Sequence, residues 1–123
     1  MSVVNVKVSN IRPKFSNLKE WMNEPNNFYI GRSGVVFIDS VRFPPEQSIF
    51  ANPFKINKKG DNNGTRDEVI AKYKSWINQK IQENSKIKLE LLNLKGKTLG
   101  CWCKPEKCHG DVLLELIDFY SKE

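Results

Sequence analysis

Three cysteines and the single histidine of this chain lie close together near the C-terminus. Cys101, Cys103 and Cys108 fall within eight residues, and His109 follows directly. Sulfur and imidazole groups at such short spacing can bind a metal, act on a ligand as nucleophile and acid/base, or fill a core. These three interpretations of the stretch 99–111 predict different functions.

The first interpretation is a zinc site. Zinc accepts three cysteines and one histidine in a tetrahedral arrangement, and Cys101, Cys103, Cys108 and His109 supply that set. The spacing is unfavourable, because neighbouring residues at a helix start rarely point at one atom, and the paired C-x2-C knuckles of many zinc modules are absent. A zinc-stabilised module that binds nucleic acid stays an alternative.

The second interpretation is a ligand site or active site without metal. A predicted strand ends near Cys103 and a predicted helix begins near Cys108, an arrangement at which α/β proteins bind ligands. The helix dipole would favour the Cys108 thiolate, and backbone N–H groups would hold a phosphate or carboxylate. Cys108 or Asp111 is then the candidate nucleophile and His109 the candidate acid/base. Cys103 and Gly110 are candidate ligand contacts, since glycine allows close approach to the backbone.

The third interpretation is purely structural. Cysteine is often buried as a small hydrophobic residue, and a single histidine often only satisfies a hydrogen bond. The stretch 99–111 would then carry no chemistry. The spacing of the residues leaves all three interpretations open.

Three further polar residues are candidates for the same site. Arg32 follows Gly31 at a predicted strand end, where its guanidinium could bind a phosphate or carboxylate or form a surface salt bridge. Asn52 precedes Pro53, which favours an extended backbone, so its amide could read a base or ribose edge or stabilise a turn. Arg66 lies in the first turn of a predicted helix, where a cation opposes the dipole, which favours another role such as facing the pocket.

The elements that would position these residues alternate between strand and helix. Runs of β-branched and aromatic residues predict strands over 3–8, 28–30, 35–38 and 98–103. Helical spacing of apolar residues predicts a short helix that stops at Pro25, a long helix from a Thr65 capping box to Ile81, a short helix over 85–94 and a last helix from near Cys108 to Tyr120. Residues 39–64 are predicted to be irregular. This alternation favours the α/β class, with three layers around a partly parallel sheet.

Length and composition limit the class of protein. The chain has 123 residues, of which 39% are hydrophobic and 11% aromatic, so we expect one folded domain over 1–123 rather than a disordered chain. No apolar run approaches the roughly 20 residues needed to cross a bilayer. Residues 1–10 lack the pattern of a secretory signal, and three clustered cysteines argue against a disulfide framework. We therefore expect an intracellular, cytoplasmic protein with no membrane partner.

The positive charge is concentrated in the first half of the chain. The formal net charge is +6, and residues 1–60 hold nine Lys/Arg against four Asp/Glu, whereas residues 61–123 hold eleven against ten. A basic half favours an anionic partner, either a nucleotide-like small molecule or a nucleic acid. Spread lysines that only give solubility are the alternative, since 16 of the 20 cations are lysines.

Several of these residues form a pattern that resembles a known family. The pattern consists of Y-I-G-R at 29–32, N-P-F at 52–54 and C-W-C-x4-C-H-G-D at 101–111. In order and distance it is similar to the DUF4326 family, a domain of unknown function found in phages, large viruses and microbes. The resemblance covers about residues 26–117. Ala51 departs from it, because the family usually has glycine before Asn-Pro-Phe.

A more distant similarity is to DUF488, in which a strand ending in Cys is followed by a Cys-His-Arg helix start on a Rossmann-like scaffold. The matching positions here hold Cys108, His109 and Gly110, so an anion would depend on backbone amides, Arg32 or a lysine. We expect a small Rossmann-like α/β domain of viral or phage origin that binds a nucleotide-like or phosphorylated small molecule. It would act as a hydrolase or transferase. Alternatives are the zinc-stabilised nucleic-acid module and a viral accessory protein that sequesters a nucleotide without chemistry.

Overall fold

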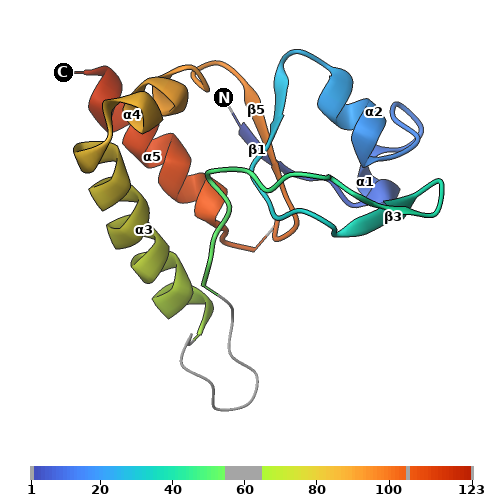
Figure 1. Ribbon diagram of the computed structural model, residues 1–123, viewed down its shortest axis with the longest axis horizontal. Coiled ribbons are helices and arrows are strands. Elements are labelled where there is room, and N and C mark those ends of the chain that lie inside the picture. Colours follow the sequence, from blue (N-terminus) through green and yellow to red (C-terminus); the bar gives the residue numbers. More distant parts are fainter. Residues whose placement is uncertain (1, 55–64, 105, 123) are drawn as a thin grey trace.

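The computed structural model describes residues 2–54, 65–104 and 106–122. Its strands are β1 (Ser2–Asn5), β2 (Asn27–Tyr29), β3 (Val36–Ile38), β4 (Val41–Phe43) and β5 (Thr98–Cys101). Its helices are α1 (Val8–Ile11), α2 (Leu18–Asn23), α3 (Arg66–Glu83), α4 (Ser85–Leu92) and α5 (His109–Ser121) (Figure 1).

The central strand, β5, lies between β1 and β2 in a three-stranded parallel sheet. Leu99 lies opposite Val3 of β1 on one side and Phe28 of β2 on the other. Because the strands are parallel, all three end at the same edge of the sheet. The segments that follow β2 and β5 therefore begin side by side, although almost 70 residues separate them in the sequence.

Helices cover both faces of this sheet. On one face, α3, α4 and α5 enclose a cluster that we call the larger core, with fifteen buried residues among those described. On the other face, α1 and α2 enclose the smaller core, whose five buried residues are Val6, Ile11, Leu18, Trp21 and Tyr29. Figure 1 shows the two groups of helices on opposite sides of β1 and β5. The predicted α/β class with a partly parallel sheet is confirmed.

The long helix α3 forms where its sequence pattern predicts it. The Thr65 side chain accepts the Glu68 N–H, and the Glu68 side chain accepts the Thr65 N–H, so the capping box is present. Its buried face consists of Val69, Tyr73, Ile77 and Ile81. The predicted helix over 85–94 is confirmed as α4, and the last predicted helix is confirmed as α5 with Cys108 as its N-cap.

Two strand predictions are too long. The first strand ends at Asn5, and Val8 begins α1 instead. The cause is local, because the Asn5 side chain accepts the Lys7 N–H and draws the backbone out of the strand. The last strand ends at Cys101, so Cys103 lies beyond the strand rather than on it.

The prediction that residues 39–64 are irregular is also wrong in part. Residues 41–43 form β4, which pairs antiparallel with β3. Asp39 and Ser40 make the connection with positive φ angles, as a two-residue type I′ hairpin turn requires. The rest of that prediction, at 55–64, lies outside the described residues. Within the described part of the chain, no helix is long and apolar enough to cross a membrane.

Candidate functional site

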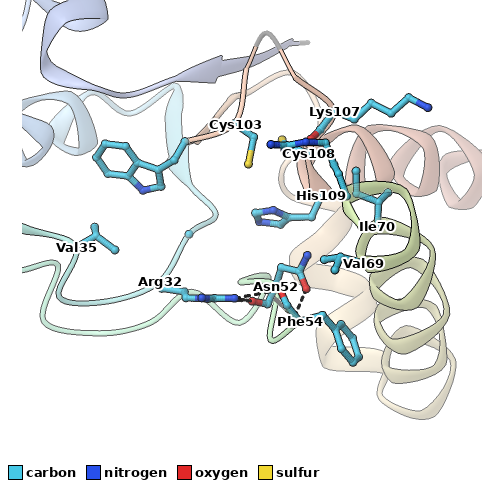
Figure 2. A pocket seen from close by; sticks show the side chains of 13 residues that line it. Arg32, Val35, Asn52, Phe54, Val69, Ile70, Cys103, Lys107, Cys108 and His109 are labelled. Atoms are coloured by element: carbon cyan, nitrogen blue, oxygen red, sulfur yellow. Dashed lines mark hydrogen bonds between the residues drawn. The ribbon is translucent and has the colours of Figure 1, made fainter. Parts of the chain in front are cut away.

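A cavity of about 420 Å³ lies at the edge of the sheet where β2 and β5 end. Besides Arg66, which is described below, five of the residues predicted for the site line it, namely Arg32, Asn52, Cys103, Cys108 and His109. They come from the segments after β2 and β5, from the start of α5 and from the loop before α3, and Figure 2 shows them around one space. The sheet topology thus brings together residues that are far apart in sequence.

Arg32 holds one wall of the cavity in place. Its Nε and Nη2 atoms donate to the Asn52 carbonyl at 3.0 and 2.7 Å, and Nη2 also donates to the Phe54 carbonyl. The Asn52 side-chain oxygen accepts the Phe54 N–H at 2.8 Å, so the turn-stabilising role considered for Asn52 is present. Figure 2 shows its amide nitrogen on the side away from that bond, toward His109. The amide keeps a donor for a ligand.

The start of α5 is capped by its own residues. The Gly110 N–H donates to the Cys108 sulfur at 3.2 Å, and the Cys108 N–H donates to the Asp111 carboxylate at 3.1 Å. These two amides are therefore already used, contrary to the expectation that such groups hold a phosphate. Gly110 does not line the cavity, and a Cβ there would lie 2.8 Å from the Val3 side chain. Glycine at 110 lets α5 pack closely on β1.

Asp111 is committed to two partners outside the cavity. Its second carboxylate oxygen accepts a hydrogen bond from Lys104 at 2.6 Å, and the two charges form an ion pair. Partial burial acts to raise the pKa of Asp111, but the hydrogen bonds from Lys104 and the Cys108 N–H outweigh it and lower the pKa. Asp111 is thus an ionised capping residue and does not face the space where a ligand would lie.

Cys101 and Cys108 form a close pair of thiols behind the cavity wall. Their sulfurs are 2.9 Å apart, and their exposed fractions are 1% and 2%. The hydrogen bond from Cys108 lowers the pKa of Cys101 to about 7, with further help from the N–H groups of Cys103 and Lys104. The same hydrogen bond raises the pKa of Cys108, and burial raises it further. The expectation of a Cys108 thiolate is therefore wrong, because Cys108 donates to Cys101.

His109 presents one ring nitrogen to the cavity. Burial lowers its pKa, so the ring is neutral near pH 7, and Nε2 donates to the Ile30 carbonyl at 2.7 Å. In that tautomer Nδ1 is a bare acceptor. Nδ1 has no hydrogen-bond partner among the described residues. Every fully buried side-chain nitrogen in that part of the chain has a partner, so Nδ1 is not fully buried and is accessible from the cavity that His109 lines. The imidazole and the Tyr73 ring form an edge-to-face contact with their centroids 5.0 Å apart, and this contact holds the His109 ring in its orientation.

Cys103 is the cysteine whose sulfur is accessible. Its side chain is partly exposed, and Figure 2 shows the sulfur pointing into the cavity toward His109. The side chains of the four residues considered as zinc ligands do not point at one common position. Cys101 and Cys108 are hydrogen-bonded to each other, and His109 is hydrogen-bonded to the Ile30 carbonyl. In the described parts of the chain, no three His, Cys, Asp or Glu side chains form a group that could hold a metal ion.

The rest of the cavity wall consists of Arg66 and of apolar residues that sequence analysis did not identify as part of the site. Arg66 lines it, as inferred from its unfavourable place at the start of α3, and its Nη1 donates to the Lys107 carbonyl. Figure 2 shows the Lys107 side chain running away from the cavity, and its Nζ lies 3.6 Å from the carboxylate of Asp67 in α3. The apolar wall is formed by Val35, Phe54, Val69, Ile70 and Trp102. Sequence analysis could not identify these apolar residues as cavity lining, because the same residue types are expected in the hydrophobic core.

A second hollow of about 610 Å³ lies elsewhere on the molecule, beside β2 and the end of α4. None of the residues predicted for the site lines it. Two carboxylates, Glu46 and Glu90, are part of its wall, whereas the first cavity has no Asp or Glu among its described lining residues. The first cavity is therefore the candidate site for an anionic ligand, although it is the smaller of the two.

Comparison with known proteins now gives the family. The family model described as a domain of unknown function, DUF4326, matches residues 14–119. The chain belongs to the DUF4326 family. The match confirms the resemblance and extends it toward the N-terminus.

A relative of this DUF4326 chain is the "Uncharacterized 12.4 kDa protein in nrdA-td intergenic region" of Enterobacteria phage T4. It is 32% identical over 76 residues, which are 62% of this chain and 70% of the phage protein. The expected association with phages is thus present among the relatives. No solved structure matches the chain.

Proposed function

We propose that this DUF4326 domain binds a small phosphorylated, nucleotide-like molecule in the cavity beside Arg32, Arg66 and His109. The observation that carries the proposal is the charge of the lining. Two arginines line the cavity, and no carboxylate does among the described residues. Guanidinium groups match phosphate oxygens in geometry and charge, so an anionic group is the favoured occupant.

The two arginines approach from separate elements. Arg32 follows β2, and its bonds to the Asn52 and Phe54 carbonyls use Nε and Nη2, which leaves Nη1 without a partner among the described residues. Arg66 begins α3 and uses Nη1 on the Lys107 carbonyl, so its other N–H groups stay available. Both guanidinium groups are fixed before a ligand arrives, which reduces the entropy lost on binding.

The rest of the lining suits the sugar and base of a nucleotide. Trp102 offers an aromatic surface and is held by a hydrogen bond from its Nε1 to the Tyr29 hydroxyl at 2.8 Å. The Asn52 amide nitrogen is a donor and His109 Nδ1 an acceptor, the pair needed to read a base edge or a ribose hydroxyl. A volume of about 420 Å³ lies in the range of small-molecule sites, roughly 300–1,000 Å³.

Calorimetric titration with AMP, ribose 5-phosphate and adenosine tests this proposal. We expect AMP to bind most tightly and adenosine to lose most of the affinity. Arg66→Ala should weaken AMP binding roughly 10-fold to 100-fold, the effect of losing hydrogen bonds to a charged group. This variant should fold, because it removes a cation from a helix start.

Lys86→Ala is the control, since it removes one positive charge from an exposed position in the first turn of α4, and Lys86 does not line the cavity. It should change AMP binding less than about threefold, as expected for a screened charge. Equal losses in both variants, or no saturable binding of any of the three probes, would contradict the proposal.

Turnover is a second candidate, favoured by one observation. Cys103 and His109 Nδ1 both face the cavity, so a thiol and a proton acceptor adjoin the same ligand. The hydrolase or transferase reaction proposed for the site would then use Cys103, because Cys108 and Asp111 are held in the cap of α5. Chromatography of AMP after incubation tests it: conversion that His109→Gln abolishes supports turnover, and unchanged AMP supports sequestration.

A further inference from the structure

The thiol pair behind the cavity has a geometry that its structural role does not require. Cys101 ends β5 and Cys108 caps α5, and their sulfurs are 2.9 Å apart in a buried setting. A serine or threonine would cap a helix as well as a cysteine does. Two thiols in direct contact, by contrast, are suited to forming a bond with each other.

The distance to a covalent bond is small. A disulfide places its sulfurs about 2.05 Å apart, so closing the gap between Cys101 and Cys108 requires less than about 1 Å of movement. Trp102, which follows Cys101, and Lys107, which precedes Cys108, belong to no helix or strand, so a small shift of either cysteine does not require a change in the sheet or in α5.

We propose that Cys101 and Cys108 are a redox-active pair that hydrogen peroxide converts to a disulfide. Cys108 is part of the cavity wall and Cys101 lies directly behind it, so peroxide that enters the cavity reaches the pair when this wall opens locally. One proton is shared in the contact between the two sulfurs, and the lowered pKa of Cys101 keeps the pair partly in the thiolate form near neutral pH. Because Cys108 donates that proton, the thiolate of the pair is on Cys101.

The reaction balances in two steps. The Cys101 thiolate attacks one oxygen of hydrogen peroxide, the O–O bond breaks, and the released hydroxide takes a proton from solvent to become water. The Cys108 sulfur then attacks the resulting sulfenic acid on Cys101, the S–O bond breaks, and a second water leaves with the Cys108 proton. Each sulfur loses one electron and the peroxide gains two. The new bond ties the end of β5 to the start of α5 and removes the thiolate charge beside the cavity.

Mass spectrometry of the full chain after peroxide treatment tests the pair. Remaining thiols are alkylated with iodoacetamide in urea, and trypsin is used to cut after Lys107, which places Cys108 in a different peptide from Cys101 and Cys103. We expect a protein lighter by two hydrogen atoms before alkylation, one alkylated cysteine at Cys103, and a 101–108 crosslink that dithiothreitol reverses.

The variant Cys103→Ser separates this pair from other pairings. It should form the disulfide to the same extent as the unaltered protein, whereas Cys101→Ala should form none. A crosslink that contains Cys103, or full alkylation of all three cysteines after peroxide, would overturn the proposal. Because the test contains no ligand, its failure leaves the proposed nucleotide site untouched.

Discussion

The two faces of the parallel sheet are packed very differently. The larger core, under α3, α4 and α5, holds fifteen buried residues in the described chain, and the smaller core, under α1 and α2, holds five. On the side of the smaller core the β3–β4 hairpin leaves Phe37 65% exposed and Val41 66% exposed. The candidate site lies where the two faces meet, because Cys108 belongs to the larger core and Trp102 packs against the smaller one.

This difference assigns different roles to the two walls of the cavity. His109 is held by the Ile30 carbonyl and the Tyr73 ring, both within the larger core. Trp102 is only partly buried, and one hydrogen bond to Tyr29 fixes it. A wall with few buried contacts opens at low free energy, so the side of the smaller core is expected to adapt to a ligand.

We expect the largest difference in the free energy of unfolding between matched leucine truncations in the larger and the smaller core. Leu113 of the larger core and Leu18 of the smaller core are both almost fully buried. Leu→Ala at buried sites costs about 2–5 kcal/mol, and the cost rises with the cavity that stays open. We expect Leu113→Ala near the upper end, because three helices hold the space open, and Leu18→Ala near the lower end. Urea unfolding measures both, and a larger loss for Leu18→Ala would reverse the comparison.

Matched tyrosine variants test the same contrast between the two cores through the hydrogen bonds of one hydroxyl group each. The Tyr73 hydroxyl donates to the Phe50 carbonyl at 2.7 Å in the larger core, and the Tyr29 hydroxyl donates to the Arg32 carbonyl in a partly buried setting. Tyr73→Phe should cost about 1–3 kcal/mol, because the Phe50 carbonyl would stay buried without a partner. Tyr29→Phe removes that bond and also the acceptor of the Trp102 Nε1–H, yet it should cost less, since water can reach the half-buried Arg32 and Trp102. Equal losses in thermal unfolding would contradict the difference in burial.

The larger-core wall should also make stability depend on pH. His109 is the chain's one histidine, and burial lowers its pKa below the usual 6.5. Below pH 6.5 the unfolded chain binds a proton that the folded chain does not, so the free energy of unfolding falls as the pH is lowered, by up to about 1.4 kcal/mol per pH unit. Urea unfolding at pH 7 and 5.5 should show a smaller drop for His109→Gln. The same drop in both proteins would exclude His109 as the cause.

The smallest effect is expected on the outer surface of the larger-core side. Lys74 of α3 and Glu115 of α5 form an ion pair at 2.7 Å with both side chains about half exposed. Exposed pairs contribute roughly 0.2–1 kcal/mol, so Lys74→Ala should cost about 0.5 kcal/mol. A double variant with Glu115→Ala isolates the pair. A loss as large as that of Tyr73→Phe would mean that surface charge, and not the core, joins these helices.

The sequence predicts the larger-core side well and the other side poorly. The capping box at Thr65 and the apolar spacing through Ile81 are local signals, and the structure confirms them. The β3–β4 hairpin was not predicted, because its turn residues Asp39 and Ser40 have positive φ angles but neither is a glycine, the residue that usually indicates such a turn. Strand ends were placed too late, since the side chain of Asn5 ends β1 through a hydrogen bond that apolar patterns do not reveal.

The sequence could predict which residues lie near the site, but not the directions in which their side chains point. Unusual polar residues at predicted strand ends pointed to Arg32, Asn52 and His109, which do line one cavity. The sequence could not tell that Cys108 would turn toward Cys101 and leave Cys103 as the accessible thiol. Side-chain direction after a strand depends on how the next segment packs, which is a tertiary property.

The most direct test of the central claim is a titration of the isotope-labelled protein with AMP, followed in two-dimensional amide NMR spectra. The account predicts saturable shifts for the amides of Arg32, Asn52, Cys103 and His109, with little change across α4. It also predicts that Arg66→Ala needs roughly 10-fold to 100-fold more AMP to reach the same shifts, while the remaining spectrum is unchanged. Shifts centred on the second hollow near Glu90, or no shifts at millimolar AMP, would contradict an anion site at this edge of the sheet.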